Sequence, residues 1–76
     1  MPSNKLKDIL DEDWKTIQGS VYDKFVLLHQ RIEGKNPSID NSDYRWVEKK
    51  IEEMEGGIIM ERQDLETANT LWKKWN

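Results

Sequence analysis

Residues 34–42 read GKNPSIDNS and divide the chain of 76 residues into two nearly equal halves. Glycine, Asn-Pro and Asn-Ser are typical of turns, and a proline cannot continue a helix. Gly34 can adopt the left-handed conformation that closes a helix, while Asp40 and Ser42 are suitable N-caps for the helix that follows. The stretch therefore predicts a loop between two helical segments.

The half before this loop carries one apolar stripe. Its members are spaced three or four residues apart, which places them on one face of a helix. They are Leu6, Leu10, Trp14, Ile17, Val21, Phe25, Leu28 and Ile32. The pattern predicts a helix over about 4–33. Gly19 lies inside it, and Ser20 with Asp23 can form a capping box that starts a new helix at this point.

The half after the loop carries a second stripe, in which steps of four and three residues alternate, as in a heptad repeat. Its members are Val47, Ile51, Met54, Ile58, Glu61, Leu65, Ala68, Trp72 and Trp75. The pattern predicts a helix over about 42–75. The pair Gly56-Gly57 lies inside it, and each glycine costs roughly 1 kcal/mol in a helix relative to alanine. Because neither stripe changes phase at its glycines, we expect two long helices that are bent or broken there.

These elements predict an all-α fold with a single domain over 1–76, in the form of an antiparallel helical hairpin. A domain this small obtains only about 3–5 kcal/mol of stability from its own core, and the chain has no cysteine for a disulfide. We therefore expect a homodimer that forms a four-helix bundle. The alternative is a monomeric bundle of four short helices, separated at Gly19, at the loop and at Gly56-Gly57.

Several large apolar residues fall outside the two stripes, and a group of such residues on a surface indicates an interface. Ile9, Leu27 and Ile59 also lie outside the stripes, but the main candidates are Tyr22, Val26, Trp46, Met60 and Leu71. Glu61 is the one charged residue within a stripe, where it can fix register or bind a basic residue of a partner. The alternative is that the helix is loosened near Gly56-Gly57, so that Glu61 reaches water. These six residues are the candidate interface with a partner or a second copy.

The sequence contains no pattern that is typical of catalysis or of metal binding. His29 has no second histidine or cysteine near it, and Gly56-Gly57 lacks the Lys-Ser/Thr of a phosphate-binding loop. A helical hairpin also offers little concavity for a substrate. We therefore expect no enzymatic activity, no cofactor, no metal and no small-molecule substrate.

The combination of short length, amphipathic helices and surplus apolar residues predicts a small non-catalytic protein–protein interaction module. It would be an adaptor, an assembly factor or an inhibitor of a larger protein machine. The alternative is a small nucleic-acid-associated regulator of helix-turn-helix type, with 58–75 as recognition helix. A net charge of −3 makes nucleic-acid binding unlikely on electrostatic grounds. No apolar run approaches the roughly 18 residues of a membrane span, and no leader pattern is found, so we expect a cytoplasmic protein.

Overall fold

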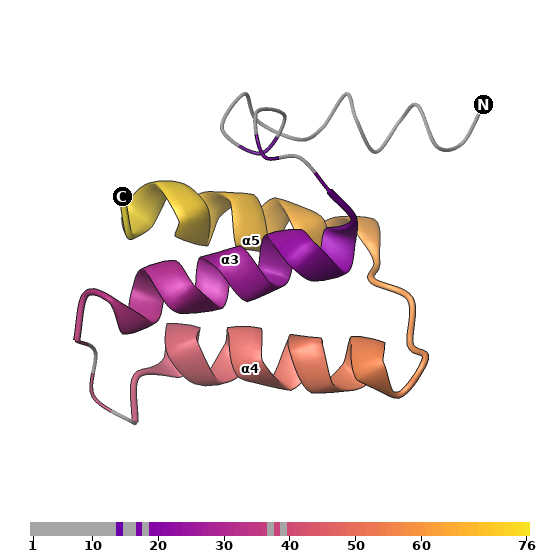
Figure 1. Cartoon of the computed structure of the whole chain (residues 1–76), viewed down its shortest axis with the longest axis horizontal. Coiled ribbons are helices and arrows are strands. Elements are labelled where there is room, and N and C mark those ends of the chain that lie inside the picture. The colour runs from indigo at the N-terminus through magenta and orange to yellow at the C-terminus, as the bar shows by residue number, and fades with distance from the viewer. Residues whose placement is uncertain (1–13, 15–16, 18, 37, 39) are drawn as a thin grey trace.

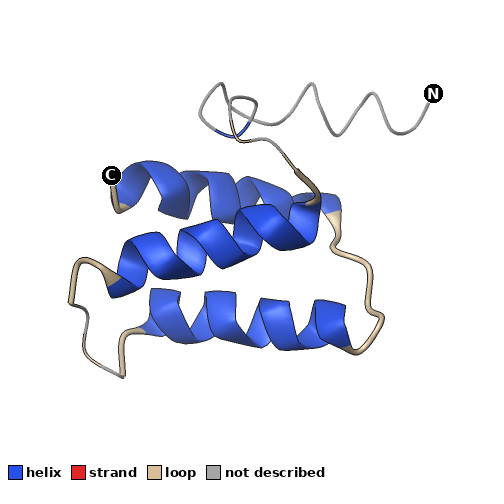
Figure 2. Cartoon of the chain, viewed as in Figure 1, coloured by secondary structure: helices blue, strands red, loops and turns tan. Residues whose placement is uncertain are grey.

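The computed structural model describes residues 14, 17, 19–36, 38 and 40–76 of the chain. These residues form three α-helices and no strand, as Figure 2 shows. The helices are α3 (Val21–Glu33), α4 (Ser42–Glu55) and α5 (Arg62–Lys74). The predicted all-α class is confirmed.

The three helices lie side by side, and α3 packs against both α4 and α5. In Figure 1, α3 and α5 run in one direction and α4 runs in the other. The loop between α3 and α4 and the C-terminus lie at one end of the bundle. The connection from α4 to α5 lies at the other end, beside the start of α3. No helix in the described part of the chain is long and apolar enough to cross a membrane.

Helix α3 begins at a new cap rather than continuing an earlier helix. Gly19 has a φ of +113°, which belongs to the left-handed region that glycine tolerates. The hydroxyl of Ser20 then accepts a hydrogen bond from the backbone N–H of Asp23 at 3.3 Å. Ser20 is therefore the N-cap of α3, as the capping pattern predicted. The helix predicted over 4–33, bent or broken at Gly19, is thus broken there, and most of its part before Gly19 lies outside the described residues.

The loop between α3 and α4 lies where the sequence predicted it. The residue with a positive φ and the N-cap of α4 differ from those predicted. Gly34 keeps right-handed helical angles, and Asn36 is the residue with a positive φ, of 58°. The cap of α4 is Asn41, whose side chain accepts a hydrogen bond from the backbone N–H of Tyr44 at 3.1 Å. The predictions of a left-handed Gly34 and of a cap at Asp40 or Ser42 are therefore wrong.

Helix α4 ends in a Schellman motif, the glycine-dependent helix ending in which two N–H groups bond back to the last turn. Gly57 has a φ of +95°. Its N–H donates to the carbonyl of Met54 at 3.0 Å, and the N–H of Ile58 donates to the carbonyl of Glu53 at 2.9 Å. The long helix predicted over 42–75, bent or broken at Gly56-Gly57, is therefore broken there into α4 and α5. The described residues form three helices, so the predicted hairpin of two long helices is not confirmed. The first helix of the alternative with four short helices lies largely outside the described residues.

The core lies between the helices, and among the described residues nine apolar side chains are buried in it. They are Trp14, Phe25, Leu28, Ile32, Val47, Met60, Leu65, Ala68 and Leu71. All except Met60 and Leu71 belong to the predicted stripes. The ring of Trp14 lies 6.0 Å from that of Phe25 and 6.1 Å from that of Trp72, between centroids. Trp14 thus anchors the segment before α3 against both α3 and α5.

Candidate functional site

The connection between α4 and α5 exposes two adjacent isoleucines. Ile58 is 56% exposed and Ile59 is 87% exposed, whereas Met60 is buried. The predicted helix over 42–75 placed Ile58 in the core stripe and Met60 outside it. The assignment reverses because residues 56–61 are not helical, so the rotation of 100° per residue no longer applies to them.

An apolar groove of about 350 Å³ lies beside these isoleucines. It is located where the start of α3, the end of α4 and the start of α5 come together (Figure 1). Every described residue that lines it is apolar or a glycine. The lining residues are Val21, Met54, Gly57, Ile58, Ile59, Met60 and Leu65.

The exposure of Ile58 follows from the residues that precede it. In a Schellman motif the residue at the position of Ile58 commonly makes an apolar contact three or four residues back from the cap. Those positions hold Glu53 and Glu52, whose carboxylates offer no apolar cover. A single exposed isoleucine needs no explanation, but two adjacent ones beside an apolar groove form a candidate binding surface.

Two hydrogen-bonded contacts hold the rim of the apolar groove. The hydroxyl of Tyr22 donates to Oε2 of Glu55 at 2.8 Å, which joins the start of α3 to the end of α4. This hydrogen bond, and then burial, raise the pKa of Tyr22 above its usual value. In the second contact, Nζ of Lys50 lies 3.4 Å from Oε1 of Glu53 and 3.4 Å from Oδ1 of Asp64.

The Lys50 contact joins α4 to the first turn of α5. Burial lowers the pKa of the ammonium, but the hydrogen bonds and charges of Glu53 and Asp64 outweigh this effect and raise it. Lys50 therefore remains charged at neutral pH and serves as an internal counterion for these two carboxylates.

The chain around the apolar groove is strongly acidic. Residues 50–66 contain six carboxylates and two cations, a formal charge of −4, whereas the whole chain has −3. Of the two cations, Lys50 is held as described, and Nε of Arg62 lies 3.5 Å from Oε2 of Glu66. In the described part of the chain, three carboxylates of this segment have no cation within ion-pair distance. They are Glu52, Glu55 and Glu61.

The structure brings three of the six candidate interface residues to the apolar groove. Tyr22 lies on its rim and is 37% exposed, Met60 lines its wall, and Glu61 follows as the exposed N-cap of α5. The remaining three lie elsewhere. Val26 is half-buried on α3, Trp46 is half-buried with its ring 6.0 Å from Phe25, and Leu71 is buried in the core.

The sequence interpretation missed Ile58 as a surface residue. The available signal was Gly56-Gly57, since a glycine just after the last periodic residue marks a helix C-terminus. The unbroken phase of the stripe concealed this ending.

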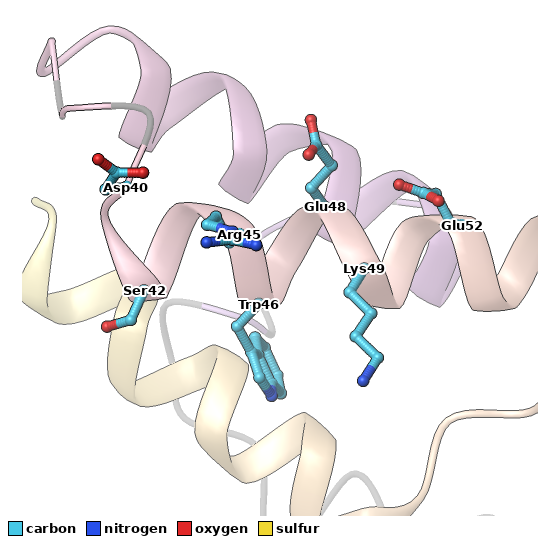
Figure 3. Close-up of a pocket in the computed structure, with 7 residues that line it drawn as sticks. All are labelled: Asp40, Ser42, Arg45, Trp46, Glu48, Lys49 and Glu52. Carbon is cyan, nitrogen blue, oxygen red and sulfur yellow. The ribbon is translucent and has the colours of Figure 1, made fainter.

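A second, polar hollow of about 450 Å³ runs along α4. It is lined by Asp40, Ser42, Arg45, Trp46, Glu48, Lys49 and Glu52. Figure 3 shows Glu48 and Glu52 pointing away from Trp46 and Lys49. Because these charged groups diverge, the hollow lacks the convergent polar groups that orient a small ligand.

His29 lies between α3 and α4. Its ring stacks on Tyr44 with centroids 4.5 Å apart. Nδ1 lies 3.8 Å from Oε2 of Glu33, and Nε2 lies 3.7 Å from Oε2 of Glu48. Burial, and then the charges of the same two glutamates, raise the pKa of Tyr44. Among the residues that the structure describes, no three histidine, cysteine, aspartate or glutamate side chains are placed to hold a metal ion.

Comparisons of the chain with protein-family models, with curated proteins and with solved structures found no match. The function is therefore inferred from the groove, its rim and the surrounding charge.

Proposed function

We propose that the chain is a small non-catalytic protein–protein interaction module that acts in the cytoplasm as an adaptor, an assembly factor or an inhibitor of a larger protein machine. It binds its partner through the apolar groove. The observation that supports this proposal is the pair Ile58-Ile59, exposed beside a groove whose described lining residues are all apolar or glycine.

The free energy available from burying Ile58 and Ile59 is large relative to the stability of this protein. Fully burying one isoleucine side chain contributes about 1.5–3 kcal/mol, and the whole core of a domain this small supplies about 3–5 kcal/mol. A partner that covers Ile58 and Ile59 would therefore gain an energy comparable to that of the fold. A helix that inserts apolar side chains into a groove is a common way to obtain it.

A displayed library of helical peptides tests the proposal. We expect selected peptides to bind the intact chain, and to bind the variant Ile58→Ser/Ile59→Ser at least about tenfold more weakly, a loss of roughly 1.4 kcal/mol. The matched control is Leu27→Ser, because Leu27 is 40% exposed on α3 and does not line the groove. Peptides that bind both variants equally, or no binding peptide at all, would overturn the proposal.

Homodimerisation into a four-helix bundle remains the alternative occupant. The sequence favoured it because the domain is small and because several large apolar residues lay outside the stripes. Two of these residues, Met60 and Leu71, are buried within the chain's own core. Light scattering at high micromolar concentration separates the two. We expect a mass near 9.1 kDa. A mass twice as large that returns to the monomer value in Ile58→Ser/Ile59→Ser would assign the groove to self-association.

A nucleic-acid regulator of helix-turn-helix type is not favoured by any described contact. Helix α5 begins after the exposed Glu61 and carries Asp64 in its first turn. Together with the charge of −4 over residues 50–66, this makes the approach of phosphates unfavourable.

A further inference from the structure

The apolar groove is surrounded by charges of one sign. Charged residues adjoin its lining residues in the chain at five positions, and all five are acidic. They are Glu53, Glu55, Glu61, Asp64 and Glu66. An apolar surface with a rim of a single sign selects partners by electrostatic complementarity.

Helix α4 adds to this negative potential. Its last turn is rich in glutamate and contains no basic residue. The C-terminal end of a helix already carries partial negative charge, so cations are favoured there and carboxylates are not. The nearby Lys50 and Arg62 are already engaged with Glu53, Asp64 and Glu66. The end of α4 therefore presents uncompensated negative charge beside the groove.

We infer that the apolar groove binds an amphipathic helix of another protein whose apolar anchors are flanked by lysine or arginine. This inference rests on the proposed function and names the chemistry of its partner. The apolar face of such a helix presents anchors three and four residues apart, which enter the groove between Ile58 and Met60. Its basic side chains meet Glu55 and Glu61, the two rim carboxylates that have no cation within ion-pair distance in the described part of the chain.

The negative charge of the rim argues against other occupants of the apolar groove. A second copy of the chain would bring another segment of charge −4 to the groove. Residues 1–13 contain the apolar Leu6 and Leu10, but they carry four carboxylates and only two lysines. Phosphate-rich surfaces, such as anionic membranes, are repelled for the same reason. A basic helix is the occupant that both the apolar lining and the rim favour.

Three designed helical peptides test this inference on the intact chain. All three share the same leucines at i, i+3, i+4 and i+7, and they differ only at the flanking positions, which hold lysine, glutamine or glutamate. Binding is measured by fluorescence anisotropy. We expect the lysine peptide to bind most tightly and the glutamate peptide at least about tenfold more weakly, because like charges across an interface are costly. The affinity of the lysine peptide should fall with added salt.

Variants of the chain test which carboxylates cause the preference for the lysine peptide. In Glu55→Gln/Glu61→Gln we expect the three peptides to bind within about twofold of one another, because rim charges control this preference. Asp40→Asn removes a carboxylate just before the start of α4, away from the apolar groove, and should leave the preference unchanged. Circular dichroism verifies that each variant keeps its helical content.

The outcomes distinguish the inference from the proposed function. If all three peptides bind equally, and all lose binding in Ile58→Ser/Ile59→Ser, the groove is an interaction site and the inference of a basic partner is overturned. Tightest binding of the glutamate peptide, or a groove-dependent homodimer, overturns the inference as well. If no peptide binds in a groove-dependent manner, the proposed function fails together with it.

Discussion

Trp75 donates its indole N–H to the carboxylate of Asp43, with 3.1 Å between Nε1 and Oδ2. The same oxygen accepts a hydrogen bond from Nζ of Lys74 at 2.7 Å. Asp43 lies in the first turn of α4, where its charge is also favourable with respect to the helix dipole. One carboxylate thus joins the end of α5 to the beginning of α4, far from the apolar groove.

We expect Asp43→Ala to lower the free energy of unfolding by about 1–2 kcal/mol, since hydrogen bonds to a charged group contribute about 1.5–3 kcal/mol and the exposure of Lys74 reduces its share. Urea unfolding followed by circular dichroism measures the change. The control is Asp40→Ala, an exposed position that should change stability by less than about 0.5 kcal/mol. Equal losses in both variants would show that the contact contributes nothing specific.

The two glycines after α4 should respond oppositely to substitution. Gly57→Ala should cost about 1 kcal/mol or more, because its φ of +95° strains any residue with a Cβ. Gly56 has a φ of −83°, and an added Cβ would lie 3.5 Å from the carbonyl oxygen of Glu53, an ordinary contact. Gly56→Ala should therefore be neutral, or stabilising by up to about 1 kcal/mol. Thermal melts of the two variants, compared with the unmodified chain, check this difference. A stable Gly57→Ala would contradict the Schellman ending.

Alanine substitutions at Leu71 and Ile59 compare a core position with a surface position. We expect Leu71→Ala to cost about 2 kcal/mol or more, which is a large part of the stability of a domain this size. Ile59→Ala should remain within about 0.5 kcal/mol, because Ile59 is 87% exposed. Both are measured by urea unfolding. A near-neutral Leu71→Ala would place Leu71 on a surface instead of in the core.

The hydrogen bond between Tyr22 and Glu55 predicts an alkaline transition. Because the pKa of Tyr22 is raised above its usual value of 10.0, the neutral phenol is favoured in the folded chain. The resulting stability is fully present below that usual value, and it is lost as the pH rises through the higher folded-state pKa. Glu55→Gln should therefore lower the pKa of Tyr22. Ultraviolet titration measures it, Tyr22→Phe identifies its transition, and Glu66→Gln should leave it unchanged.

The two stripes predicted most of the core correctly, because a helical period survives in each segment even where the helix is interrupted. Leu71 shows the limit of that approach. Relative to the long stripe over 42–75 it lies off the apolar face. Over α5 alone, however, Leu65, Ala68, Leu71 and Trp72 fall within an arc of about 120° at 100° per residue. The face of a helix can be assigned only when its ends are known, and the ends depended on Gly19 and Gly57.

The candidate site could be predicted only in part for the same reason. Tyr22, Met60 and Glu61 were expected at an interface and lie at the groove, whereas Ile58 was assigned to the core. The acidic composition of residues 50–66 could be read from the chain, but its position around an apolar groove could not. That position requires the start of α3 to lie beside the end of α4, a contact between residues more than thirty positions apart.

By itself, the sequence determined the helical class, the loop over 34–42 and most of the core, because these depend on local periodicity and on the backbone preferences of proline and asparagine. Only the tertiary structure decided where the helices stop and which isoleucines reach water. The physical reason is that a glycine inside a periodic pattern is compatible with both a bent helix and a helix end. The choice between them depends on the packing of Met60, Leu65 and Leu71 against the other helices.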